Sequence, residues 1–163
     1  MKQPDAHSAA PGFPPDDVIA GLLEDATRAP SMHNTQPWRF RVRPASQEIE
    51  LHADPSRALR FSDPQGRAVH IACGAALFNL RLAVLMAGRE PAVRLLLDPG
   101  PHPPPRPPTL LATVRLAGIQ HPGETDRELH AAIATRRTNR RPYSNLPVPP
   151  GVLGELAAAA SIP

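Results

Sequence analysis

Two polar stretches of the chain hold the residue types that could bind a ligand. The first, residues 29–40, reads Ala-Pro-Ser-Met-His-Asn-Thr-Gln-Pro-Trp-Arg-Phe and brings hydroxyls, an imidazole, two carboxamides and an indole close together. A carboxamide carries donor and acceptor groups side by side, and the pyrimidine edge of a flavin ring offers the same alternation. The other interpretation is a capped turn, in which Ser31 and Asn34 bond to their own backbone.

The second stretch, residues 136–143, reads Arg-Arg-Thr-Asn-Arg-Arg-Pro-Tyr. Four arginines and a hydroxyl within six positions suit a phosphate, because a guanidinium group binds an oxyanion through two parallel hydrogen bonds. A solvated basic loop that follows a helix is the alternative.

The elements that would position the first stretch can be predicted from apolar spacing. A helix should begin near Asp16 and Asp17, which supply a cap and a negative first turn, and it should end at Pro30. Its apolar stripe is Val18, Ile19, Leu22, Leu23 and Ala26. Alternating apolar residues predict two strands, 38–42 and 49–53, which form a hairpin around a turn at 44–47.

The rest of the chain predicts a small mixed or antiparallel sheet flanked by helices, an α+β fold. A long helix should run from the Asp63–Pro64 pair to Gly88, and since it is apolar on nearly every face we expect it to be buried all round. The further elements expected are strands at 92–97 and 110–116, a proline-rich connection at 99–108, helices at 124–134 and 152–160, and a loop at 136–144.

Composition excludes several classes of protein. The chain has 163 residues, a net charge of +3, one cysteine and 4% aromatic residues. A lone cysteine allows no internal disulfide, and seven histidines without metal-ligand spacing predict no metal site. Aromatics are too few for a base-stacking platform, and no apolar run approaches the ~20 residues that cross a bilayer. We therefore expect a cytoplasmic protein that binds neither nucleic acid nor membrane.

The end of the chain echoes its beginning. Residues 15–20, Pro-Asp-Asp-Val-Ile-Ala, are similar to residues 149–154, Pro-Pro-Gly-Val-Leu-Gly, and in both places a proline-led turn opens an apolar helix. If the echo is real, a second copy of one unit begins near residue 136. The division predicted is a flexible tail (1–14), a first half (15–135) and the start of a truncated second half (136–163).

Together the two stretches resemble the nitroreductase family. An apolar helix, Ala-Pro-Ser, Asn-x-Gln-Pro-Trp and a strand form one hallmark, and Arg-Arg-Ser-x-Arg, here with Thr138 for Ser, forms the other. The segments Asp-Pro-Ser-Arg (54–57), Cys-Gly-Ala (73–75) and Arg-Thr-Asn-Arg (137–140) are similar to the Acg-like branch. That branch fuses two nitroreductase-like halves in one chain, and the resemblance covers the N-terminal half only, from about residue 16 to 160.

The resemblance implies an FMN-dependent oxidoreductase that passes electrons from NAD(P)H to a small acceptor, with flavin at the interface between two halves or two subunits. The implied contacts to the ring and ribityl chain are Ser31, Asn34 and Gln36. The implied contacts to ribityl and phosphate are Arg136, Arg137, Thr138 and Arg140. No catalytic residue is assigned, and a second half or a homodimer is expected to complete the site. Flavin sequestration without turnover and an inactive truncated remnant are the alternatives.

Overall fold

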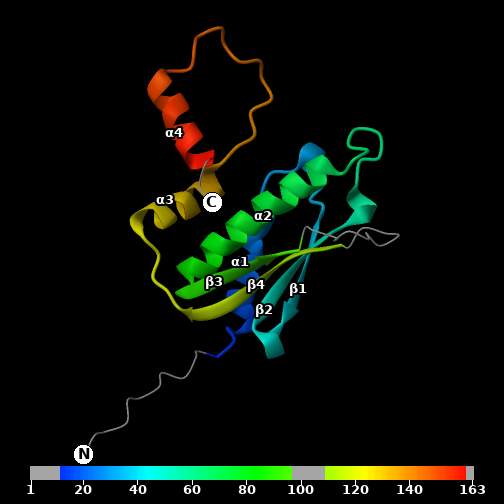
Figure 1. Ribbon diagram of the computed structural model, residues 1–163, viewed down its shortest axis with the longest axis vertical. Coiled ribbons are helices and arrows are strands. Elements are labelled where there is room, and N and C mark those ends of the chain that lie inside the picture. Colours follow the sequence, from blue (N-terminus) through cyan, green and yellow to red (C-terminus); the bar gives the residue numbers. More distant parts are fainter. Residues whose placement is uncertain (1–11, 97–108, 161–163) are drawn as a thin grey trace, which may run out of the picture.

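The computed structural model describes residues 12–96 and 109–160, and within them it has an α+β architecture (Figure 1). The expected tail up to residue 11 and the proline-rich connection at 99–108 lie outside the described residues. The sheet has four strands, all antiparallel, in the order β1-β2-β4-β3. Helix α2 packs against this sheet, and α1 and α3 pack against α2.

The first two strands form the predicted hairpin. Strand β1 (Trp38–Arg43) pairs with β2 (Glu48–Ala53), from Trp38 opposite Ala53 to Arg43 opposite Glu48. The turn is a short helix, η2 (Pro44–Ser46), closed by Gln47 in a left-handed conformation. Alternation sends Trp38, Phe40 and Val42 toward the helices, while the intervening arginines face outward.

The remaining two strands complete the sheet. Strand β4 (Leu110–Ile119) lies between β2 and β3 (Arg89–Leu95), so the third strand in sequence occupies an edge. The predicted strand at 92–97 therefore begins three residues earlier than expected. The side chains fully buried between sheet and helices include Ile49, Leu51, Leu80, Val84, Val114 and Leu116.

Helix α1 (Asp16–Thr27) buries the predicted stripe through Ile19, Leu22 and Ala26. The expected side-chain cap is wrong: Pro15 occupies the N-cap position, where no side chain accepts a hydrogen bond from the helix. Asp16 and Asp17 instead lie in the first turn, where the helix dipole favours negative charge.

Helix α2 (Arg67–Met86) begins three residues after the position expected from the Asp63–Pro64 pair. Gly66 precedes it with a φ of 69°, a conformation that costs glycine little. Asp63 still stabilises this end, because its carboxylate accepts a hydrogen bond from the Val69 amide at 3.1 Å. The expected burial on every face is wrong as well, since the Ile71 side chain is 72% exposed.

The two C-terminal helices differ in how much of their surface they bury against the rest of the fold. Helix α3 (Glu124–Thr135) buries Ile133 and joins α1 through His130, whose Nε2 lies 2.8 Å from Asp25 Oδ2. The chain from residue 136 to 149 then arches away from the other helices, and α4 (Pro150–Ala160) follows with exposed leucines and valine (Figure 1).

By length and composition, α2 is the one helix in the described part of the chain that could cross a membrane. Over half of its apolar window is buried inside the molecule, as is usual for the core helix of a soluble domain.

Candidate functional site

The segment between α1 and β1, which we call the amide loop (residues 31–37), has an unusual backbone. Its short helix η1 (Met32–Asn34) contains His33 at φ 51° and Asn34 at φ 57°, and Gln36 follows at φ 49°. Non-glycine residues rarely adopt these left-handed angles, which cost free energy unless surrounding contacts hold them. One such contact is internal, because Ser31 Oγ accepts a hydrogen bond from the Gln36 amide at 2.9 Å.

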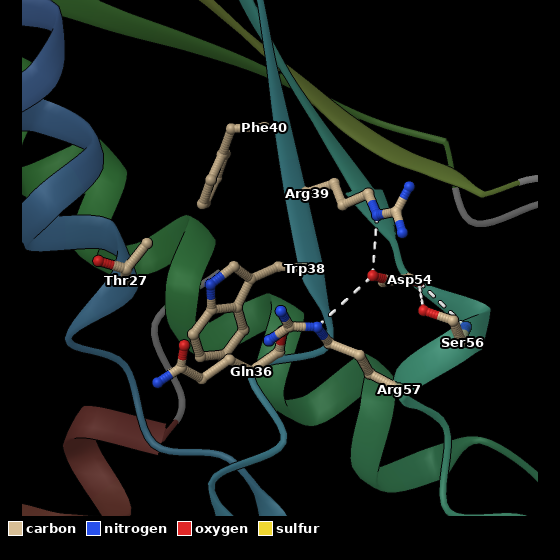
Figure 2. Close-up of a pocket in the computed structure, with 8 residues that line it drawn as sticks. All are labelled: Thr27, Gln36, Trp38, Arg39, Phe40, Asp54, Ser56 and Arg57. Atoms are coloured by element: carbon tan, nitrogen blue, oxygen red, sulfur yellow. Dashed lines mark hydrogen bonds and ion pairs between the residues drawn. The ribbon is translucent and has the colours of Figure 1, made fainter.

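The amide loop borders an open pocket of about 410 Å³ (Figure 2). Its lining residues are Thr27, Gln36, Trp38, Arg39, Phe40, Asp54, Ser56 and Arg57. Figure 2 shows the Gln36 carboxamide beside the Trp38 indole, with the Arg57 guanidinium at the backbone end of Gln36. An aromatic face, an amide and a cation around one cavity suit a planar, polar ligand.

Asp54 is the buried charge of this pocket. It is 3% exposed and accepts hydrogen bonds from the Ser56 hydroxyl at 2.6 Å, the Ser56 amide at 3.0 Å and Arg39 Nε at 2.8 Å. Arg57 Nε lies 3.6 Å from the same carboxylate. The Ser56 bonds, assisted by Arg39, hold the pKa of Asp54 below its ordinary value despite the opposing effect of burial.

Sequence reasoning did not single out this cluster for a role in the site. The Asp-Pro-Ser-Arg pattern is a recognisable signal for a turn in which Asp accepts hydrogen bonds from the following backbone. The contacts that Arg39 and Arg57 make with residues far away in the sequence depend on the tertiary fold.

The second predicted stretch, which we call the arginine loop (residues 136–141), is an exposed coil after α3. Arg136 donates to the Arg28 carbonyl at 3.0 Å and to the Thr138 hydroxyl at 3.2 Å. Arg137 turns back on its own segment and donates to the Ala134 and Arg136 carbonyls. Within residues 12–96 and 109–160, no carboxylate forms an ion pair with any arginine of this loop.

The structure brings the start of the arginine loop to the end of α1, just before the amide loop. The bond from Arg136 to Arg28 places the start of the arginine loop against the end of α1, three residues before Ser31. Of the seven predicted site residues, Gln36 lines the 410 Å³ pocket, and the other six do not: Ser31, Asn34, Arg136, Arg137, Thr138 and Arg140. The two predicted halves of the site therefore both adjoin the end of α1, and no hydrogen bond among the described residues joins one loop to the other.

Comparisons with known proteins show the family to which the chain belongs. Residues 9–96, more than half of the chain, match the nitroreductase family. The chain belongs to the nitroreductase family, as its two sequence hallmarks predicted, and the α+β fold expected from that resemblance is confirmed.

Several relatives come from Mycobacterium tuberculosis. Strain H37Rv protein Rv3131, provisionally named an NAD(P)H nitroreductase, is 41% identical over 91% of this chain and 41% of its own length. The protein acg of the same strain, also provisionally named an NAD(P)H nitroreductase, is 34% identical over 80% of this chain and 37% of its own length. The chain thus spans about two fifths of the length of the curated relatives it matches.

Among solved structures, the nitroreductase family protein from Streptococcus pneumoniae TIGR4 is 19% identical to this chain. The superposition covers 85% of this chain and 88% of that one, with a TM-score of 0.49.

Proposed function

We propose that this chain supplies the FMN-binding loops of an oxidoreductase that uses NAD(P)H to reduce a small acceptor. Family membership and the names of the relatives support the reaction class. The observation that carries the proposal is the bond from Arg136 to the Arg28 carbonyl, because it holds the start of the arginine loop against the end of α1, three residues before the amide loop that the same flavin nucleotide would have to touch.

The chemistry of the donor groups fits this cofactor. Gln36 presents a half-buried carboxamide at a pocket edge, where an isoalloxazine ring could exchange hydrogen bonds with it. Arg137 and Arg140 are exposed cations that form no ion pair with a described carboxylate, so a phosphate could bind them without displacing an acidic partner.

The predicted residues have two roles in this proposal, one for each loop. Ser31, Asn34 and Gln36 bind the ring and ribityl chain, with Ser31 also fixing the turn through the Gln36 amide. Arg136, Arg137, Thr138 and Arg140 hold ribityl and phosphate. When bound, FMN would supply the redox chemistry that links NAD(P)H to a small acceptor.

We further propose that a second nitroreductase-like unit completes the site, either in a longer chain or in a second copy. Residues 15–135 would form one unit, and residues 136–163 would start the next. Support comes from α4, whose apolar side chains are unburied: Val152 is 43% exposed, Leu153 52% and Leu156 60%. Apolar surface of this kind is typical of an interface.

The test is flavin binding followed by anaerobic reduction. Protein mixed with FMN and separated by gel filtration should retain a yellow chromophore, which NAD(P)H should bleach without oxygen. Stable colour would favour flavin sequestration without turnover, and protein that takes up no FMN would contradict the proposal. A cytoplasmic location would be checked by cell fractionation.

A further inference from the structure

The amide loop carries backbone strain that its own side chains do not fully explain. Residues 33, 34 and 36 all have φ near +50°. Within the loop, the backbone amides of residues 34 and 35 donate to the carbonyls of residues 31 and 32, and the backbone amide of Gln36 donates to Ser31 Oγ, but none of these bonds uses the carbonyl of residue 35 or 36. Such angles persist when neighbouring structure holds them. The carbonyls of residues 35 and 36 therefore depend on a donor from outside the loop.

Arg57, which lies twenty-one residues beyond Gln36, makes that contact. Its Nη1 donates to the Thr35 carbonyl at 3.2 Å and to the Gln36 carbonyl at 3.4 Å. The same guanidinium lies with Nε 3.6 Å from Asp54 Oδ2, so it joins the carboxylate to two successive peptide groups of the loop (Figure 2). A planar fork with several donors can make such contacts together, and a lysine ammonium cannot.

Asp54 is in turn fixed to the sheet. Its carboxylate is held by Ser56 and by Arg39 of β1, and its own amide donates to the Pro37 carbonyl at 2.9 Å. The buried Cys73 thiol of α2 also donates to the Pro37 carbonyl, at 3.4 Å. The end of the loop is thus tied to β1, to the segment after β2 and to the central helix.

We infer that Arg57, held by Asp54, is a positioning residue that keeps the Thr35 and Gln36 peptides in the conformation that presents the Gln36 side chain to the pocket. This inference rests on the proposed function only where it concerns flavin. Fixing the loop in the absence of ligand follows from the contacts alone. Arg57 itself needs no contact with the cofactor.

The chain offers a matched control. Arg43, on β1, makes an Nε bond of 2.9 Å to Glu50, and its side chain is 47% exposed against 53% for Arg57. Both are exposed arginines that form an ion pair with a carboxylate, but Arg43 makes no hydrogen bond to a carbonyl of the amide loop. Arg57→Ala and Arg43→Ala therefore remove the same charge and differ in the loop contacts.

The first readout needs no cofactor. Trp38 is the single tryptophan, is 7% exposed and lines the same pocket as Gln36 and Arg57. In flavin-free protein, Arg57→Ala should make Trp38 fluorescence more accessible to acrylamide quenching, whereas Arg43→Ala should leave it unchanged. Circular dichroism would verify that both variants are folded.

The second readout is FMN affinity. If loss of the Arg57 contacts reduces the population of the loop conformation that binds FMN to roughly one tenth, the apparent Kd for FMN rises about tenfold, because apparent affinity scales with the fraction of protein able to bind. Arg43→Ala should bind FMN like wild type. If Arg57→Ala does not fold, Arg57→Lys is measured instead, and it should shift both readouts in the same direction.

Quenching and Kd that match wild type in a folded Arg57 variant would overturn the inference, as would equal changes in Arg43→Ala. If wild-type protein binds no FMN, the proposed function fails, and the quenching comparison alone decides whether Arg57 holds the amide loop.

Discussion

The arginine loop gives the most direct test of the proposed flavin site. Arg137 and Arg140 are exposed and have no acidic partner in the described part of the chain, so removing them breaks no ion pair there. If each donates one charge-assisted hydrogen bond to phosphate, each contributes at least ~1.5 kcal/mol. The double variant Arg137→Ala/Arg140→Ala should then lose about 3 kcal/mol, a roughly hundredfold weaker Kd for FMN.

The assay is titration of flavin fluorescence with FMN and, separately, with riboflavin, which lacks the phosphate. The variant should lose much more affinity for FMN than for riboflavin, which keeps only the ribityl contacts. Arg94→Ala/Arg115→Ala is the control, since it removes two exposed sheet arginines and changes the net charge equally. Unchanged FMN affinity, or an equal loss for both ligands, would refute the phosphate assignment.

Three further predictions concern stability and reactivity. The folded state lowers the pKa of Asp54, so the ionised carboxylate stabilises the folded protein above the unfolded pKa of ~3.9, and this stabilisation is lost as the pH falls through the folded pKa. In urea unfolding, the free energy of unfolding of Asp54→Asn should therefore fall less at acid pH than that of wild type. Equal pH profiles would contradict this. Gly88 has a φ of 76°, so Gly88→Ala should lower the free energy of unfolding by about 1 kcal/mol. Gly74 lies in α2 with open space around it, so Gly74→Ala should raise the free energy of unfolding by about 0.5–1 kcal/mol. Chemical denaturation measures both changes, and two changes of the same sign would contradict the reasoning. Burial raises the pKa of the Cys73 thiol to about 11, so a disulfide reagent at pH 8 should react with it far more slowly in folded than in unfolded protein.

Secondary structure could be predicted where the side-chain period was clear. Alternation in residues 38–42 and 49–53 gave both strands of the hairpin, and the stripe of Ile19, Leu22 and Ala26 gave the buried face of α1. The order of the sheet could not be predicted, because pairing of β2 with β4 depends on contacts across about sixty residues. The start of α2 was misplaced since the Asp63 side chain caps it from outside the helix.

The candidate site was predictable in its residue types and not in its support. Amides and guanidiniums identified two loops, but Asp54 and Arg57 act through bonds to a segment about twenty residues away. Their sequence shows a turn, and only the fold shows what the turn touches. The assignment of Ser31, Asn34, Gln36 and the arginine loop to flavin stays a prediction.

The left-handed backbone of the amide loop also limits which sequences can occupy it. Near φ +50° a β-branched side chain clashes with its own backbone, whereas asparagine and glycine are tolerated. Asn34→Gly should therefore preserve the turn, and Asn34→Val should distort it even in ligand-free protein. The side chains of this segment therefore determine the backbone conformation of the loop as well as its contacts with any bound molecule. Two proteins that share the motif are expected to share this loop conformation even where they bind different molecules.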